Sequence, residues 1–152
     1  MYLKEYLKKF ENQKIKMYVD MDGVIADYEV GIPHGFDKKR PLISNISKLE
    51  EISKMDNVEL FILSITRMNQ GYEEKNVWLD QHAPFFKKEN RVIISRESND
   101  FISSPDLKSS FLKNLERDDS VIIVIDDDPS VLHKIKETSE DIILLKDTVL
   151  VD

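Results

Sequence analysis

Three short apolar segments, each followed by polar residues, place the strongest constraint on how this chain folds. They are Ile15–Val19, Val58–Ile65 and Ser120–Ile125. The last two are almost entirely apolar, and runs of this length and kind are typical of strands buried on both faces of a parallel sheet. Segments with helical periodicity separate them. The sequence therefore predicts an α/β fold, a Rossmann-like arrangement of three layers with a central parallel sheet.

Apolar residues at helical spacing predict a helix in each connection. The expected helices cover residues 2–10, a segment containing Ile46, Leu49 and Ile52, Tyr72–His82, Pro105 to Leu115, and a segment containing Val131, Leu132 and Ile135. Two shorter strands, Arg91–Ile94 and Asp141–Leu145, complete the expected sheet. The stretch over residues 31–41 holds two glycines and two prolines, and we expect it to be a loop.

Individual side chains at helix ends and on helix faces carry further expectations. The expected caps are Asn45 or Ser47 for the second helix, Ser103 or Ser104 for the fourth, and Asp128 for the last. The apolar residues of the third helix that should face the core are Val77, Trp78 and Leu79.

Length and composition limit the classes of protein to consider. A chain of 152 residues can bury a sizeable core, and we expect a single domain over residues 1–152. The net charge of −7 argues against long nucleic acid as the main partner, because binding a nucleic-acid backbone needs a basic face. No cysteine is present, which excludes disulfides and thiolate zinc sites. No apolar run has the length of a secretory signal or a membrane span, so we expect no membrane partner and a cytoplasmic location.

Candidate functional residues lie at the points where the expected strands end. Asp20 and Asp22 follow the first strand, and Ser64 lies near the end of the second. Asp126 and Asp127 follow the apolar segment that ends at Ile125. Since ligands bind at the carboxyl ends of parallel strands, we expect these side chains to converge at one edge of the sheet. Four carboxylates at close range repel one another without a cation, and ligands that are all oxygen favour magnesium.

Several stretches of the sequence resemble haloacid-dehalogenase-like (HAD) phosphohydrolases. VDMDGVIAD, residues 19–27, is similar to their first motif, the apolar segment ending in Ser64 to their second, and residues 121–127 to their fourth. DMDGVIADYEVGI and EKNVWLDQHAPFF together resemble the 5'(3')-deoxyribonucleotidases. DLKSSFL followed by IDDDPSVL also resembles the phosphatase module of polynucleotide kinase-phosphatases. Matching segments run from Lys16 to Lys136, and they imply a HAD-like fold.

The resemblance also implies a role for each acid. Asp20 would be the nucleophile that forms an aspartyl-phosphate, and Asp22 would be the general acid and base. Mg²⁺ would be held by the Asp20 carboxylate, the Asp22 backbone carbonyl and Asp126, with Asp127 assisting. Ser64 would hydrogen-bond a phosphoryl oxygen.

The remaining candidates are aromatic or basic. Tyr28 matches an aromatic residue that faces the substrate in the nucleotidases, and Arg67 is a candidate phosphate clamp just past the second motif. The third motif is a lysine that offsets charge on the phosphoryl group. Lys75 matches it in the nucleotidase pattern EKNVW, and Lys108 in the end-phosphatase pattern DLKSSFL. We favour Lys75 because the surrounding match is longer, and we expect the other lysine to be a solvated helix residue.

Nucleotidases of this kind carry a sizeable helical cap between the first and second motifs. Here only the loop over residues 31–41 and one helix fit between Asp27 and Val58, so the cap is expected to be minimal or absent. No GxxxxGK phosphate loop is present, which excludes a kinase half. The leading interpretation is a magnesium-dependent phosphomonoester hydrolase acting on a small phosphorylated substrate, such as a nucleoside monophosphate. The alternatives are a phosphatase acting on nucleic-acid ends or a phosphoprotein, and a HAD-fold binding module that has lost the chemistry.

Overall fold

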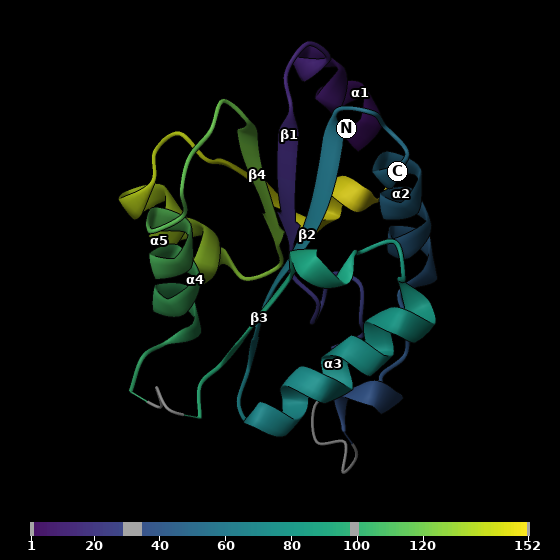
Figure 1. Ribbon diagram of the computed structural model, residues 1–152, viewed down its shortest axis with the longest axis vertical. Coiled ribbons are helices and arrows are strands. Elements are labelled where there is room, and N and C mark those ends of the chain that lie inside the picture. Colours follow the sequence, from purple (N-terminus) through teal and green to yellow (C-terminus); the bar gives the residue numbers. More distant parts are fainter. Residues whose placement is uncertain (1, 29–34, 98–100, 152) are drawn as a thin grey trace.

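A parallel five-stranded sheet in the order β3-β2-β1-β4-β5 forms the centre of the protein in the computed structural model (Figure 1). The structure describes residues 2–28, 35–97 and 101–151. The strands are β1 (Ile15–Val19), β2 (Val58–Thr66), β3 (Arg91–Ser95), β4 (Val121–Asp126) and β5 (Ile143–Lys146). The predicted parallel sheet is confirmed, including the short strand β3, which pairs in parallel with β2.

Helices connect the strands and cover both faces of the sheet. The α-helices are α1 (Leu3–Leu7), α2 (Ile43–Ser53), α3 (Asn69–His82), α4 (Ser104–Lys113) and α5 (Pro129–Thr138). Short 3₁₀ helices are η1 (Lys8–Phe10), η2 (Phe36–Lys38), η3 (Lys88–Asn90) and η4 (Asp147–Leu150). None of the helices within the described residues has both the length and the apolar character needed to cross a membrane.

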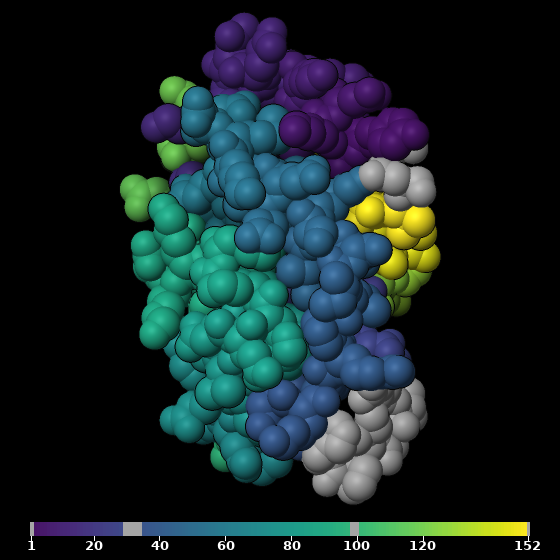
Figure 2. All heavy atoms as spheres, turned by 90° about the vertical axis from the view of Figure 1, so that its right-hand side faces the viewer, coloured from purple at the N-terminus to yellow at the C-terminus, as the bar shows by residue number. Residues whose placement is uncertain are grey.

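The sheet separates two helical layers. Helices α4 and α5 lie together on one side, and α1, α2 and α3 lie on the other (Figure 1). Figure 2 shows the second side, where α2 (blue) lies beside α3 (teal) below the N-terminal segment (purple). The three-layer α/β architecture expected from the sequence is therefore confirmed.

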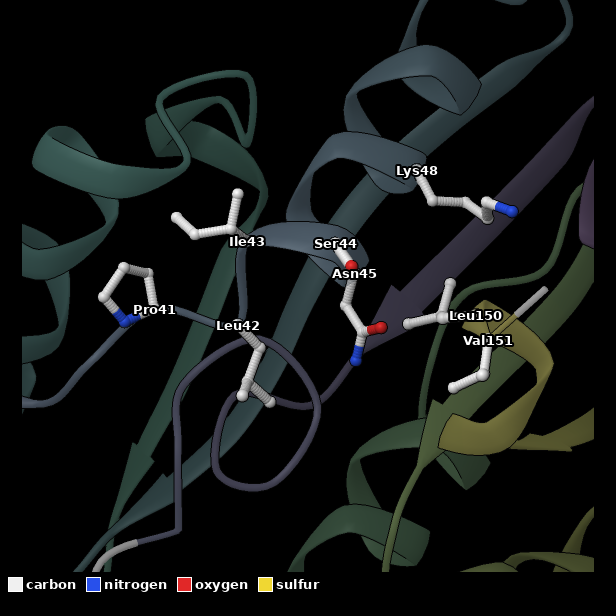
Figure 3. Close-up of a pocket in the computed structure, with 8 residues that line it drawn as sticks. All are labelled: Pro41, Leu42, Ile43, Ser44, Asn45, Lys48, Leu150 and Val151. Carbon is white, nitrogen blue, oxygen red and sulfur yellow. The ribbon is translucent and has the colours of Figure 1, made fainter.

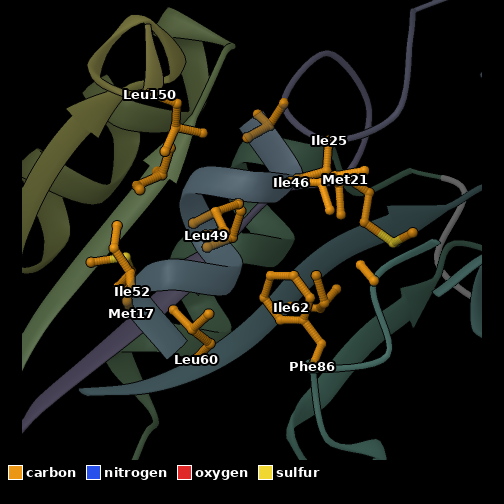
Figure 4. Close-up of a cluster of buried hydrophobic side chains, with 14 of the residues drawn as sticks. Met17, Met21, Ile25, Ile46, Leu49, Ile52, Leu60, Ile62, Phe86 and Leu150 are labelled. Atoms are coloured by element: carbon orange, nitrogen blue, oxygen red, sulfur yellow. The ribbon is translucent and has the colours of Figure 1, made fainter. Parts of the chain in front are cut away.

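The alternation of side chains along the strands divides the core between these layers, because successive residues of a strand point to opposite faces. Met17 and Val19 of β1 join the cluster covered by α2, whereas Tyr18 between them joins Leu112 of α4 and Val131 of α5. Figure 4 shows the first cluster, in which side chains of α2 pack over β1 and β2; its labelled members include Ile46, Leu49, Ile52, Met17, Leu60 and Ile62. Burying one such side chain contributes about 1.5–3 kcal/mol.

Helix α2 begins earlier than the sequence predicts. Its N-cap is Leu42, which makes no side-chain capping bond, so the expectation of a cap at Asn45 or Ser47 is wrong. The side-chain amide of Asn45 instead donates to the backbone carbonyl of Val24 at 2.7 Å. The Asn45 side chain therefore makes a tertiary contact with the turn after β1 and does not cap the helix.

Helix α3 also begins earlier, at Asn69 rather than at Tyr72. Its first turn contains Gly71, where a Cβ would lie 1.8 Å from Oγ1 of Thr66. A glycine with this packing role weakens the helical signal of the sequence and hides the true start. The expectation that Val77 faces the core is wrong as well, because that side chain is 54% exposed, while Trp78 and Leu79 are buried as expected.

The other cap expectations agree with the structure. The Ser103 hydroxyl accepts from the backbone N–H of Asp106 and caps α4. The Asp128 carboxylate accepts from the backbone N–H of Ser130 at 2.8 Å and caps α5. Of the expected loop over residues 31–41, residues 31–34 lie outside the described part, and residues 36–38 form η2.

Candidate active site

Two acids from neighbouring strands form the centre of the candidate site. Strands β1 and β4 pair with Val19 opposite Ile125, so Asp20 and Asp126, the next residue in each case, lie side by side at the carboxyl edge. The backbone N–H of Asp20 donates to the carbonyl of Ile125 at 3.0 Å. Both acid side chains are buried. The strand register alone thus brings the two acids together.

Asp127 completes an acidic cluster that suits a metal ion. Carboxylate oxygens of Asp20, Asp126 and Asp127 lie within 4.8 Å of one another. Ligands that are all oxygen, negatively charged and this close together match the preference of a hard divalent cation such as Mg²⁺. The donor set therefore fits the ion that the sequence motifs imply.

The turn after β1 allows Asp127 to come this close. The Met21 carbonyl accepts hydrogen bonds from the N–H groups of residues 24–26, and Gly23 has a φ of +80° within that turn. A Cβ at Gly23 would lie 2.0 Å from Oδ2 of Asp127. Glycine is required here both for the left-handed backbone conformation and for the space it leaves to the neighbouring carboxylate.

Lys108 lies among the acids of the metal cluster. Its ammonium donates to Oδ1 of Asp20 at 2.9 Å and to Oδ2 of Asp126 at 2.7 Å. The side chain comes from α4 and is buried. Burial alone would lower the pKa of Lys108, but the two carboxylates outweigh burial and raise that pKa above its ordinary value. Lys108 is therefore a fixed positive charge beside the candidate nucleophile.

Lys75 contacts Asp22 and the end of β2. Its ammonium donates to Oγ of Ser64 at 2.6 Å and to the Ile65 carbonyl at 2.8 Å, and it lies 3.5 Å from Oδ2 of Asp22. Burial lowers the pKa of Lys75, against the opposing effect of the Asp22 and Asp20 carboxylates. Ser64 and Lys75 thus form a buried hydrogen-bonded pair.

Both lysines are buried, so the expectation that one of them is a solvated helix residue is wrong. The sequence also predicts that Lys75 lies in the first turn of its helix together with Glu73 and Glu74, and this expectation is wrong. Because α3 begins at Asn69, Lys75 lies in the second turn and not in the first, and no acid occupies the first turn. Its long side chain still reaches the carboxyl edge of β2.

The Asp22 carboxylate is held by two lysines. Lys39 pairs with Oδ1 of Asp22, while Lys75 faces Oδ2. Sequence reasoning did not select Lys39, which belongs to the basic run KKR at residues 38–40. Lys38, next to it, has the same residue type but an exposed side chain. Nothing in the run itself therefore indicates which of the two lysines contacts the site.

A cavity of about 390 Å³ opens above these groups. Its lining residues are Asp20, Asp22, Tyr28, Ile65, Ser104, Lys108, Asp126, Asp127, Asp128 and Val131. Tyr28 is 66% exposed, so its ring is available to a ligand rather than part of the core. Ser64 and Lys75 lie outside this lining, whereas Lys108 is part of it.

Arg67 is not part of that lining. It borders a separate hollow with Met68, Arg96 and Glu97, at the ends of β2 and β3.

A third hollow, of about 640 Å³, lies between the start of α2 and the C-terminal residues Leu150 and Val151 (Figure 3). It is larger, but its lining contains none of the candidate acids, so the chemistry assigns the site to the acidic cavity.

The protonation of Asp20 is strongly perturbed by its surroundings. Burial, opposed by Lys108 and reinforced by the charge of Asp126, raises the pKa of Asp20 from 3.8 to about 7. Burial and then Asp126 also raise the pKa of Asp127. Raised carboxyl pKa values are typical of functional sites, because acids are placed close together there to bind a cation or to react with a substrate.

Comparisons with known proteins identify the fold. No family model and no curated protein matches the sequence. Among solved structures, a chain of the Pnkp1/Rnl/Hen1 complex matches with a TM-score of 0.69 and 14% identity, over 88% of this chain and 46% of that chain. A chain from a second structure, the Pnkp1/Rnl/Hen1 RNA repair complex, matches with a TM-score of 0.67 and 16% identity, over 89% of this chain and 42% of that chain.

A third match covers most of both chains. The HAD domain of the effector protein Lem4 from Legionella pneumophila matches with a TM-score of 0.53 and 16% identity, over 88% of this chain and 84% of that domain. The protein spans less than half the length of the matched chains from the Pnkp1/Rnl/Hen1 structures. At these identities the likeness concerns the fold, and it shows that this chain has a haloacid-dehalogenase-like fold.

Proposed function

We propose that the protein is a magnesium-dependent phosphomonoester hydrolase that works through an aspartyl-phosphate. The observation that carries this proposal is the position of Asp20. Its carboxylate lines the cavity, contacts the Lys108 ammonium and belongs to the acidic cluster with Asp126 and Asp127. A carboxylate in these surroundings can attack phosphorus while positive charge offsets the negative oxygens of the phosphoryl group.

The proposed reaction has two steps. In the first, the Asp20 carboxylate attacks phosphorus, the bond from phosphorus to the ester oxygen breaks, and Asp22 gives that oxygen its proton. In the second, a water oxygen attacks the same phosphorus while Asp22 takes the proton of the water. The bond between Asp20 and phosphorus breaks, which releases inorganic phosphate and restores the carboxylate.

The positive charge at the site comes from two sources in this proposal. Mg²⁺ held by Asp20, Asp126 and Asp127 supplies charge stabilisation to the phosphoryl oxygens when it is bound. Lys108 supplies the second positive charge, since it lines the cavity and contacts the nucleophile. Its raised pKa keeps it protonated. The sequence favoured Lys75 for this role, but its contacts with Ser64 and Ile65 support a different one, in which it holds Ser64 and the far oxygen of Asp22.

For the substrate we propose a small phosphorylated metabolite, such as a nucleoside monophosphate. The exposed ring of Tyr28 at the cavity offers a face on which a base can stack. A phosphorylated nucleic-acid end is the second candidate. It is supported by the likeness to chains of an RNA repair complex, and by the connection from Ala26 to α2, whose described residues contain η2 and no larger cap.

A phosphatase assay tests the proposal. We expect the protein to hydrolyse p-nitrophenyl phosphate with Mg²⁺, to lose activity with EDTA, and to regain it when Mg²⁺ is restored. Asp20→Asn is the matched control, and its turnover should fall by about a thousandfold or more, as for the loss of other nucleophiles. A correctly folded wild-type protein without activity toward any phosphomonoester would favour the binding-module alternative.

A panel of substrates decides between the two substrate classes. Nucleoside monophosphates and short oligonucleotides with 5'- or 3'-terminal phosphates should be compared by kcat/KM. We expect the monophosphates to be preferred. A higher kcat/KM for a phosphorylated end would move the assignment to an end-phosphatase without changing the proposed chemistry.

A further inference from the structure

Lys39 extends into the site from the shortened connection that stands where related proteins carry a cap. It follows η2 directly, and its side chain is 19% exposed, whereas that of its neighbour Lys38 is 67% exposed. The Lys39 ammonium pairs with Oδ1 of Asp22. Because Lys75 lies 3.5 Å from Oδ2, each oxygen of this carboxylate faces a different lysine.

Several contacts hold Lys39 in place. Its backbone carbonyl accepts a hydrogen bond of 2.9 Å from Nε1 of Trp78, a fully buried residue of α3. Its ammonium lies 4.7 Å from the centre of the Phe36 ring, and that ring packs edge-on against Trp78. The Tyr28 ring lies 5.8 Å from the same ammonium. A cation between aromatic faces is favourably placed, so the position of this lysine is built into the fold.

The backbone around Lys39 is also tied to the turn that carries Asp22. The N–H of Asp27 donates to the Arg40 carbonyl, and the N–H of Leu42 donates to the Ile25 carbonyl, both at 2.8 Å. The connection and the turn after β1 therefore form one unit. The lysine and the carboxylate are held by the same short stretch of structure.

We propose that Lys39 is the positioning residue for Asp22 in proton transfer. This inference rests on the proposed phosphatase function and adds to it a residue outside the sequence motifs. Proton transfer requires the carboxylate oxygen to lie within hydrogen-bond reach of the leaving oxygen and later of water. A carboxylate bound at only one oxygen can rotate, and small misplacements cost rate. Lys75 makes shorter bonds to Ser64 and Ile65 than to Asp22, so Lys39 provides the stronger of the two contacts that orient the Asp22 carboxylate.

The proposal assigns no proton to Lys39 itself. Asp22 gives and takes the proton, and Lys39 holds one of its oxygens so that the other is directed consistently. The loss of Lys39 should therefore lower kcat and leave KM almost unchanged. The loss of kcat/KM, which reports the first step, should also depend on the leaving group, because a nitrophenolate leaves readily without a proton and an alkoxide does not.

The test compares Lys39→Met, Lys39→Arg and the matched control Lys38→Met, each with Mg²⁺ and with two substrates. For an alkyl phosphate such as glycerol 2-phosphate, we expect Lys39→Met to lower kcat by about tenfold or more, within the range contributed by a positioned acid or base. With p-nitrophenyl phosphate we expect a smaller loss of kcat/KM than with the alkyl phosphate. For the alkyl phosphate, KM should stay within about twofold of wild type, Lys39→Arg should recover part of the loss, and Lys38→Met should show wild-type kinetics.

Other outcomes overturn the inference. Wild-type kcat for the alkyl phosphate in Lys39→Met would do so, and so would an equal loss with both substrates accompanied by a large fall in the melting temperature. If Lys39→Met does not fold, Lys39→Gln undergoes the same comparison, because it keeps a polar group at the position without the charge. A folded wild-type protein that hydrolyses neither substrate would instead reject the proposed function. The two failures are thus distinguishable.

Discussion

At the scale of single residues, the site is organised around charges that the fold has largely removed from water. Asp20 and Asp126 are buried, and the Lys108 ammonium bridges them. Breaking such a buried pair by removing one partner is costly, since it leaves an uncompensated charge. Burying both charges also costs their hydration, so the presence of the pair is weak evidence that it stabilises the fold. The arrangement keeps a reactive carboxylate close to positive charge, which the proposed phosphoryl transfer needs.

The two buried lysines should respond differently to substitution. Lys108→Met removes the charge beside the candidate nucleophile, and we expect kcat with saturating Mg²⁺ to fall about 10²–10³-fold. Lys75→Met leaves Ser64 and the Ile65 carbonyl without their shared donor, so the expected effect is a loss of about 1–3 kcal/mol in the free energy of unfolding. Steady-state kinetics and urea unfolding of both variants measure the two effects. A larger fall in kcat for Lys75→Met than for Lys108→Met would reverse the assignment.

Any side chain at Gly23 should destabilise the protein. Its φ of +80° disfavours L residues, and a Cβ would lie 2.0 Å from the Asp127 carboxylate. We expect Gly23→Ala to destabilise the protein by about 1–3 kcal/mol and to weaken Mg²⁺ binding, measured by urea unfolding and by calorimetric titration. Gly35→Ala is the control, because its φ is −70° and its nearest neighbour is the flexible end of Glu74. Equal effects in the two variants would contradict this explanation.

At the scale of elements, the end of β4 and the loop after it serve both the site and the next helix. Asp126 and Asp127 contribute to the acidic cluster, and the following Asp128 caps α5. We expect Asp128→Ala to lower the free energy of unfolding by about 0.5–2 kcal/mol, and Asp128→Asn to retain most of it, because asparagine also caps helices. Chemical denaturation of both variants checks this. A similar loss in Asp128→Asn would show that the charge matters more than the cap.

The sequence predicts the sheet well because its signals are local. The apolar runs of β2 and β4 identify buried strands without any tertiary information, and the acids at the ends of β1 and β4 identify the functional edge. Helix starts are predicted less well. The side chain of Asn45 makes a tertiary bond to Val24, and Gly71 packs against Thr66, so neither residue serves the local role that its type suggests.

The candidate site shows the same division between local and tertiary signals. Asp20, Asp22, Asp126 and Asp127 lie at or just after the ends of strands, and their convergence follows from parallel pairing. Residues brought in by helices or loops depend on tertiary packing, which a motif cannot reveal. For this reason the sequence does not predict the position of Lys39. Arg67 lies close to Ser64 in the sequence, but in the structure it borders a different hollow.

At the scale of the whole molecule, the acidic site couples folding to protons and metal. Three carboxylates and one ammonium meet in a largely buried place, in a chain whose net charge is already −7. A divalent cation that binds only the folded state adds RT ln(1 + [Mg²⁺]/Kd) to the stability. The metal-free protein should therefore be the less stable form, and its stability should depend on pH through Asp20.

The sign of that dependence follows from the direction of the shift. The pKa of Asp20 is raised from 3.8 to about 7 in the folded, metal-free protein. Between these values the folded state binds more protons at Asp20 than the unfolded state, so the stability contributed by this group falls as pH rises from about 4 to about 7. Asp20→Asn cannot ionise and should lack this contribution, which makes it the matched control.

We expect the melting temperature of the wild-type protein in EDTA to decrease relative to that of Asp20→Asn as pH rises through this window. Addition of Mg²⁺ at pH 7.5 should then raise the wild-type melting temperature more than that of the variant, because the variant lacks one ligand and one repelling charge. Thermal unfolding at several pH values, with and without Mg²⁺, measures both effects. Parallel pH curves for the two proteins in EDTA would show that Asp20 ionises normally, and would remove the electrostatic reason for coupling metal binding to the nucleophile.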